Sequence, residues 1–240
     1  MAEPLESGPF RRRLDRIYLA YTASFILFVL ALAMLERMGM PKHWIGVTFL
    51  LSTVLLYAGI GILSRTTDPT EYYVAGRRVP AFYNGMATAA DWMSAASFIS
   101  LAGALYLQGF SGSGIHPGGL VYVLGWTGGF CLLALFVAPY LRQLNLYTLP
   151  DYFDHRFGGR WPRIIAAWSA VLCSFIYVVA QIYGVGLITS RLTGVQFEIG
   201  ILLGLGGVLV CSFLGGMRAV TWTQVAQYII LIIAYLVPVV

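Results

Sequence analysis

The chain has 240 residues, of which 59% are hydrophobic and only 10% are charged. About a quarter of the residues of an ordinary soluble domain are charged, so this composition excludes a soluble globular protein and predicts an all-α polytopic membrane protein. The net charge of +5 is small and its basic residues lie in short loops between apolar segments, so we expect a lipid bilayer and no nucleic acid as partner.

Apolar segments recur along the whole chain. Residues 1–16 are polar, contain an arginine cluster and are expected to form a cytoplasmic tail. The apolar segment that follows is too long for a signal peptide, so we expect it to remain as a membrane anchor. A helical span needs about 20 mainly apolar residues. Seven spans are expected on this basis, at residues 17–35, 44–63, 82–107, 120–141, 164–188, 199–214 and 220–240.

The positions of the basic residues agree with this count. With the tail placed inside, only Arg37, Lys42 and Arg191 of the 15 lysine and arginine residues fall on the outer side. Cytoplasmic loops are enriched in these residues, so the pattern predicts a multi-pass protein of the inner (plasma) membrane with a cytoplasmic N-terminus. The seventh span has no loop after it, and we expect an N-terminal fragment of a longer protein, with an odd number of spans as the alternative.

The third span, residues 82–107, contains the acidic residue Asp91. A carboxylate inside a membrane costs at least about 2.5–3.5 kcal/mol and normally faces a protein interior or a pathway. A local break of the helix near Ala90–Met93 would direct the polar residues around it into one cavity. The alternative is a packed helix whose hydroxyls bond back to its own carbonyls, with Asp91 capping a turn. The polar residues recur every third position, at Thr88, Asp91, Ser94, Ser97 and Ser100.

Three further local patterns are informative. Thr148-Leu149-Pro150-Asp151 is typical of a capped helix start and predicts a short helix to Arg156, whose aromatic and arginine residues suit the headgroup level of a bilayer. Gly215 and Gly216 indicate a tight inner turn before the seventh span. Gly200 and Gly204 indicate close helix packing.

Three segments together carry a family resemblance: YYVAGRRVPAFYNGMATAADWMSAASFISLAGALY, TLPDYFDHRFGG and FLGGMRAVTWTQVAQ. In this order they resemble the sodium:solute symporter family, and most of all its acetate (monocarboxylate) permease branch, from about Tyr72 to the last residue. The resemblance implies a LeuT-type inverted-repeat fold. Residues 17–35 would then be an extra N-terminal helix, residues 44–63 the helix preceding the repeat and residues 82–240 the first five-helix repeat, with the second repeat absent.

The resemblance also implies a binding site at the broken third span. The carbonyls of Ala90 and Met93 match sodium-ligating positions of the family, and Asp91 would belong to the same cation site. Ser94 and Ser97 would face the substrate. Because the family completes its sodium site with hydroxyls from the second repeat, only half of that site is expected here. Free N–H groups at the start of the second half-helix favour a carboxylate.

Polar residues on the fifth span extend this expected site. Gln181 matches a glutamine of the acetate-permease branch, and Tyr177 lies four residues before it on the same helical face, so both are predicted to face the substrate. Tyr183 is predicted to make interfacial or interhelical hydrogen bonds. Gln224 stands where many members of the family have an acidic residue associated with release of the cation to the cytoplasm.

The expected function is secondary active symport of a small monocarboxylate such as acetate, coupled to sodium or to protons, by alternating access. A transporter-like sensor domain of a signalling protein and a non-transporting membrane scaffold are the alternatives. The sequence leaves open whether a small membrane protein binds as a partner subunit. No cofactor is expected, and the sodium ion is expected to act as the coupling ion.

Enzymatic activity is not expected. The sequence contains no nucleophile–base pair and no phosphate-binding loop. Its three histidines lie in separate loops without metal-ligand spacing. Its three cysteines lie inside apolar segments, where a thiol usually behaves as a small hydrophobic group, so neither a disulfide framework nor a metal site beyond the sodium site is predicted.

Overall fold

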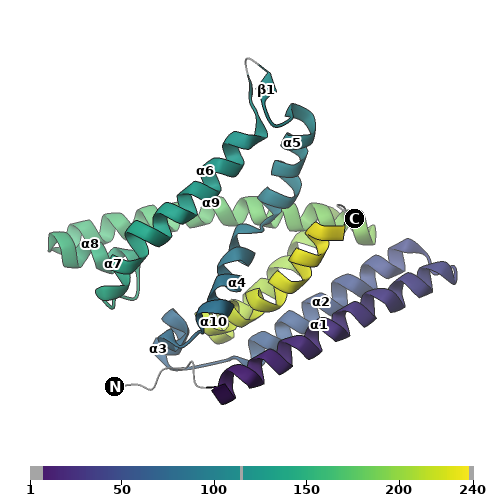
Figure 1. The fold of residues 1–240 in the computed structure, drawn as a ribbon, viewed down its shortest axis with the longest axis horizontal. Coiled ribbons are helices and arrows are strands. Elements are labelled where there is room, and N and C mark those ends of the chain that lie inside the picture. The colour runs from purple at the N-terminus through teal and green to yellow at the C-terminus, as the bar shows by residue number, and fades with distance from the viewer. Residues whose placement is uncertain (1–7, 114–115, 238–240) are drawn as a thin grey trace. The chain divides into compact units, whose positions relative to one another are not determined.

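The computed structural model describes residues 8–113 and 116–237 of the chain (Figure 1). The first seven residues of the expected tail and the last three of the expected seventh span lie outside these ranges. The described part is almost entirely helical, which confirms the all-α polytopic class. Five of its helices are long and apolar enough to cross a membrane: Pro9–Arg37, Lys42–Leu63, Gly119–Gln143, Arg160–Thr193 and Ser212–Leu236.

Two of the seven expected spans are present as shorter pieces. The expected span at residues 82–107 is divided into the helix Ala81–Trp92 and the apolar helix Ser97–Gln108, each of 12 residues. The expected span at residues 199–214 corresponds to the shorter apolar helix Phe197–Val210.

The described residues divide into two compact units. Unit 1 takes the chain up to Ser94 and again from Val185, whereas unit 2 is Ala95–Gly184. The elements of unit 1 are α1 (Gly8–Arg37), α2 (Lys42–Leu63), α3 (Pro69–Val74), η1 (Ala75–Arg77), α4 (Ala81–Trp92), the end of α9 (Arg160–Thr193) and α10 (Phe197–Leu236).

Helix α1 begins earlier than the sequence pattern predicts. Residues 8–16, which were expected to belong to the polar tail, form its first turns. Proline is favoured in the first turn of a helix, and arginine is a good helix former, so Pro9 and the arginine cluster start the helix instead of preceding it.

The core of unit 1 joins α1 to α4 and α10. Tyr83 on α4 is only 2% exposed and packs with Ala87 and Val225 in a buried cluster. The ring centroid of Tyr18 on α1 lies 5.4 Å from that of Tyr83. The Tyr83 hydroxyl also donates a hydrogen bond of 2.6 Å to Asp15 Oδ1. Helix α1, which was expected to be an added helix, is therefore fixed to α4 by both apolar and polar contacts.

A single glycine bends α10 into two segments. Gly216 has φ 52° and ψ −143°, which interrupts the helix between Phe197 and Leu236. This conformation is almost restricted to glycine. A Cβ atom at this position would lie 2.7 Å from Cδ2 of Tyr72. The tight turn predicted at the glycine pair is therefore confirmed.

We expect Gly216→Ala to destabilise the protein. The backbone strain alone is about 1–3 kcal/mol, and the new methyl group would also collide with the Tyr72 ring. Gly206→Ala is the matched control, because no atom lies within 4 Å of its added Cβ and alanine is the better helix former. Thermal unfolding of the detergent-solubilised variants checks this. Equal melting temperatures for the two variants would contradict the assigned turn.

The predicted close packing at the other glycine pair is also observed. A Cβ atom on Gly200 would lie 3.1 Å from the Gly186 carbonyl oxygen, and one on Gly204 would collide with the Val185 side chain. The first segment of α10 therefore packs directly on the end of α9, as the spacing predicts.

Unit 2 contains the π-helix η2 (Ala96–Leu101), α5 (Ala102–Gln108), a two-residue antiparallel pair and a long apolar region. In the antiparallel pair Gly112 faces Pro117 and Ser113 faces His116. Next to the hairpin, Gly119 lies against the side chain of Leu105, with no room for a Cβ atom. The remaining elements are β1 (Gly112–Ser113), β2 (His116–Pro117), α6 (Gly119–Leu132), the π-helix η3 (Leu133–Val137), α7 (Ala138–Gln143), α8 (Leu149–Phe157) and the first part of α9.

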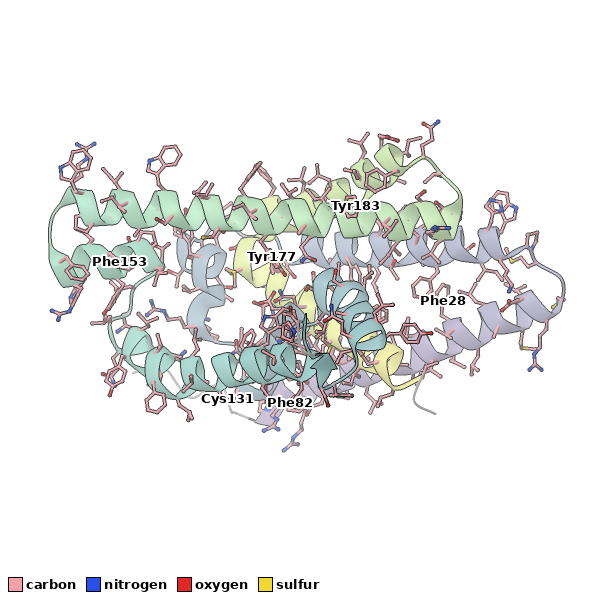
Figure 2. The ribbon with its side chains drawn as sticks, turned by 90° about the horizontal axis from the view of Figure 1, so that it is seen from above. Phe28, Phe82, Cys131, Phe153, Tyr177 and Tyr183 are labelled. Atoms are coloured by element: carbon pink, nitrogen blue, oxygen red, sulfur yellow. The ribbon has the colours of Figure 1, made fainter. Side chains whose placement is uncertain are left out.

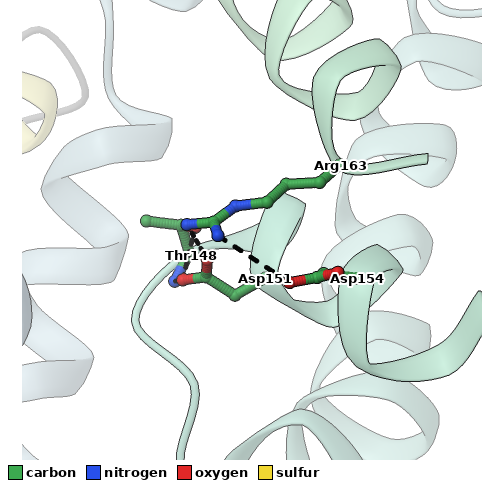
Figure 3. A network of polar contacts seen from close by, with 4 residues as sticks. All are labelled: Thr148, Asp151, Asp154 and Arg163. Atoms are coloured by element: carbon green, nitrogen blue, oxygen red, sulfur yellow. Dashed lines mark hydrogen bonds and ion pairs between the residues drawn. The ribbon is translucent and has the colours of Figure 1, made fainter. Parts of the chain in front are cut away.

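The predicted capped helix is present as α8. The Thr148 N–H and hydroxyl both donate to Asp151 Oδ2, at 3.0 and 2.7 Å. Arg163 at the start of α9 reaches Asp151 at 2.9 Å and Asp154 at 3.7 Å (Figure 3). These contacts fix α8 to the beginning of α9, so the polar connection is an ordered corner.

Candidate functional site

Helix α4 ends at Trp92, within the region where a break is predicted. Met93 has φ −79° and ψ 65°, outside the helical region. The Ser94 N–H donates to the Trp92 carbonyl at 2.9 Å, whereas an α-helix would direct it to the carbonyl of Ala90. The helical course resumes at Ala95 and continues into the π-helix η2. The break therefore interrupts the regular hydrogen bonding beside the two predicted sodium-ligating carbonyls.

No glycine or proline lies between Trp92 and Ala95, so the break needs contacts from elsewhere in the chain. Within unit 2, the Ala95 N–H donates to Oε1 of Gln181 on α9 at 3.3 Å. A Cβ atom on Gly184 would lie 2.7 Å from the Ala95 Cβ. Helix α9 thus approaches the start of the second half-helix closely and provides an acceptor for one of its unpaired N–H groups.

The carboxylate of Asp91 has a partner that the sequence did not reveal. Nε2 of Gln224, in the second segment of α10, donates a hydrogen bond to Asp91 Oδ1. Both residues belong to unit 1, and the Asp91 side chain is exposed. The interaction joins the last turn of α4 to α10. An amide partner leaves the negative charge of the carboxylate uncompensated, which suits a cation-binding role.

Gln224 also lines a cavity of about 220 Å³ inside unit 1. The cavity lies between α2 and the two segments of α10, and five of its nine lining residues have polar side chains on a mostly apolar wall. Hydroxyl and amide groups of this kind can hold water or a hydrated cation. Its polar lining residues are Tyr57, Ser212, Thr223, Gln224 and Gln227. Among these, only Gln224 was singled out from the sequence.

The predicted site residues divide between the two units. Ala90, Asp91, Met93 and Ser94 lie in unit 1, and Ser97, Tyr177 and Gln181 lie in unit 2.

Their burial differs. Ala90 and Ser97 are buried, whereas Met93 and Ser94 are half-buried. Tyr177, which is labelled in Figure 2, is 52% exposed.

Thr88 and Tyr183 are two other polar residues that the sequence analysis named. The Thr88 hydroxyl donates to the Asn84 carbonyl of its own helix at 2.9 Å, as the alternative of back-bonded hydroxyls predicts. Tyr183, also labelled in Figure 2, is 61% exposed on α9. Thr88 bonds within its own helix whereas Asp91 bonds to Gln224, so the polar residues that recur every third position do not share one role.

Comparisons with known proteins cover most of the chain. The family model described as "Sodium:solute symporter family" matches residues 72–240. A protein of Cupriavidus necator named "Uncharacterized symporter" is 54% identical over 242 residues. That alignment covers 98% of this chain and 34% of the relative, so the chain spans about a third of the relative's length. No solved structure matches the chain.

Proposed function

Because the chain belongs to the sodium:solute symporter family, we propose that the protein containing it is a secondary active symporter for a small monocarboxylate such as acetate. Sodium is the proposed coupling ion, with protons as the alternative. The proposed architecture is the first repeat of a LeuT-type fold, in which a broken helix forms the binding site near the midplane. The family points to a transporter and not to an enzyme.

The observation that carries this proposal is the interruption at Met93. Main-chain carbonyls released from helical hydrogen bonds are hard oxygen ligands, which sodium prefers, and the N–H groups of the next half-helix attract a carboxylate. The proposed cation site therefore contains the carbonyls of Ala90 and Met93 with Asp91 beside them. Ser94, Ser97 and Gln181 are the proposed substrate groups, and Tyr177 is retained as a peripheral one.

Uptake measurements test the proposed function. Full-length protein in proteoliposomes should accumulate radiolabelled acetate when an inward sodium gradient is imposed, and should accumulate less without it. A panel of short carboxylates then defines the substrate, and a proton gradient applied alone tests the other coupling ion. Failure to transport any of these acids under either gradient would contradict symport of small monocarboxylates and favour the sensor or scaffold alternative.

The proposed orientation can be checked with single cysteines. We expect a cysteine at His155, in α8, to react with an impermeant maleimide only after the cells are permeabilised, because this basic region should be cytoplasmic. A cysteine at Lys42, at the start of α2, should react in intact cells. Both are made after Cys131, Cys173 and Cys211 are replaced by serine. The opposite labelling pattern would overturn the cytoplasmic N-terminus.

A further inference from the structure

A second cavity of unit 1, separate from the residues at the helix break, lies between α1, α2 and the second segment of α10. It is a groove of about 590 Å³. Most of its wall is apolar, from α1 and from the last turns of α2. Residues that contribute this apolar wall include Leu14, Ile17, Leu56, Ile60 and Leu63.

The groove has one basic end. The Tyr18 hydroxyl donates to the Trp222 carbonyl, and the Tyr21 hydroxyl donates to the Ala226 carbonyl. These two hydrogen bonds show that α1 and the second segment of α10 run in the same direction, with Arg13 near the level of Arg218. Arg13 and Arg218 both line the groove, and among the residues that the structure describes no acidic side chain lines it.

Within residues 8–113 and 116–237, neither arginine is fully neutralised. Arg218 makes an ion pair of 3.5 Å with Glu71, and its side chain is 40% exposed. A guanidinium group has five N–H donors, so this pair leaves donors for a further anion. Arg13 is exposed. Ser64, at the end of α2, adds a hydroxyl to the lining near this end.

An apolar trough with two guanidinium groups at one end matches an amphipathic anion. In a bilayer, that description fits a phospholipid whose acyl chain lies along the helices and whose phosphate meets the arginines. Basic pockets between membrane helices on the cytoplasmic side favour such headgroups, and the sequence pattern places this end of α1 inside. We propose that the groove between α1, α2 and α10 binds one anionic phospholipid, with its phosphate held by Arg13 and Arg218.

Native mass spectrometry of the full-length protein tests this directly. Phosphatidylglycerol and phosphatidylcholine of equal chain length are titrated onto delipidated protein, and the retained lipid is counted. We expect selective retention of one phosphatidylglycerol. Each of Arg13→Gln and Arg218→Gln should weaken it about fivefold, because one basic side chain contributes about 1 kcal/mol near an anionic surface. The matched control is Arg12→Gln, one residue away on α1 and outside the groove.

A second pair of variants leaves the charges intact. Ile60→Trp should fill the groove and abolish retention of the lipid. Leu55→Trp on the same helix should not, because Leu55 lies outside the groove and is 70% exposed. Equal losses for Arg12→Gln and Arg13→Gln would overturn the site in favour of general surface charge. Equal retention of both lipids, or displacement of the lipid by inorganic phosphate alone, would also overturn it. So would no retention at all, which indicates that another protein segment fills the groove.

Discussion

Asp91→Asn should raise the sodium concentration needed for half-maximal uptake by at least about fivefold in the full-length protein. Two unit charges 4 Å apart interact by about 4 kcal/mol at the effective dielectric constant of sites near a protein surface. A quarter of that energy already corresponds to about fivefold in affinity. Asparagine keeps the shape of the side chain and can still accept a hydrogen bond from Gln224, so the change isolates the charge.

Two other variants complete this test: one removes a negative charge elsewhere, and the other removes the hydrogen bond to Asp91 but keeps its charge. Glu198→Gln removes one negative charge from an exposed position in the first turn of α10 and should leave the sodium dependence unchanged. Gln224→Leu removes the amide donor but keeps the carboxylate. If Gln224→Leu abolished uptake while Asp91→Asn kept the normal sodium dependence, Asp91 would serve only to join α4 to α10.

Much of the fold could be predicted from the sequence because its signals are local. The capped start at Thr148 and the turn at Gly216 each depend on a few neighbouring residues, and both are present. The polar composition of residues 8–16 predicts a tail and does not show that they are helical, although arginine is a good helix former and these residues form the first turns of α1. The attachment of α1 through Asp15 and Tyr83 joins residues 68 positions apart, which no local pattern could indicate.

The candidate site was predictable only in its position along the chain. The acidic residue in an apolar segment pointed to Asp91, and the family resemblance pointed to the break beside it. Its partner is 133 residues away in sequence, on α10. Gly184 was missed because its importance lies in the close approach of α9 to Ala95, and a glycine inside an apolar segment has several ordinary explanations.

Gln181→Glu should raise the KM for the carboxylate substrate by at least about tenfold without destabilising the protein. The glutamate keeps an acceptor for the Ala95 N–H, and a negative charge at the start of a helix is favourable. It replaces the amide N–H donors, however, with a carboxylate that repels an anionic substrate. Uptake kinetics and thermal unfolding of the full-length variant, measured together, check both parts.

The comparison with Gln181→Leu distinguishes a substrate-binding group from a helix cap. Leucine removes the acceptor and leaves the Ala95 N–H unpaired, which costs about 1–3 kcal/mol if the group is buried, so this variant should lose both uptake and stability. Gln143→Glu, at the exposed end of α7, makes the same chemical change elsewhere and should behave as the wild type. A normal KM for Gln181→Glu together with an unstable Gln181→Leu would restrict Gln181 to holding the second half-helix. Binding of the carboxylate would then be left to the serines and main-chain N–H groups at the break.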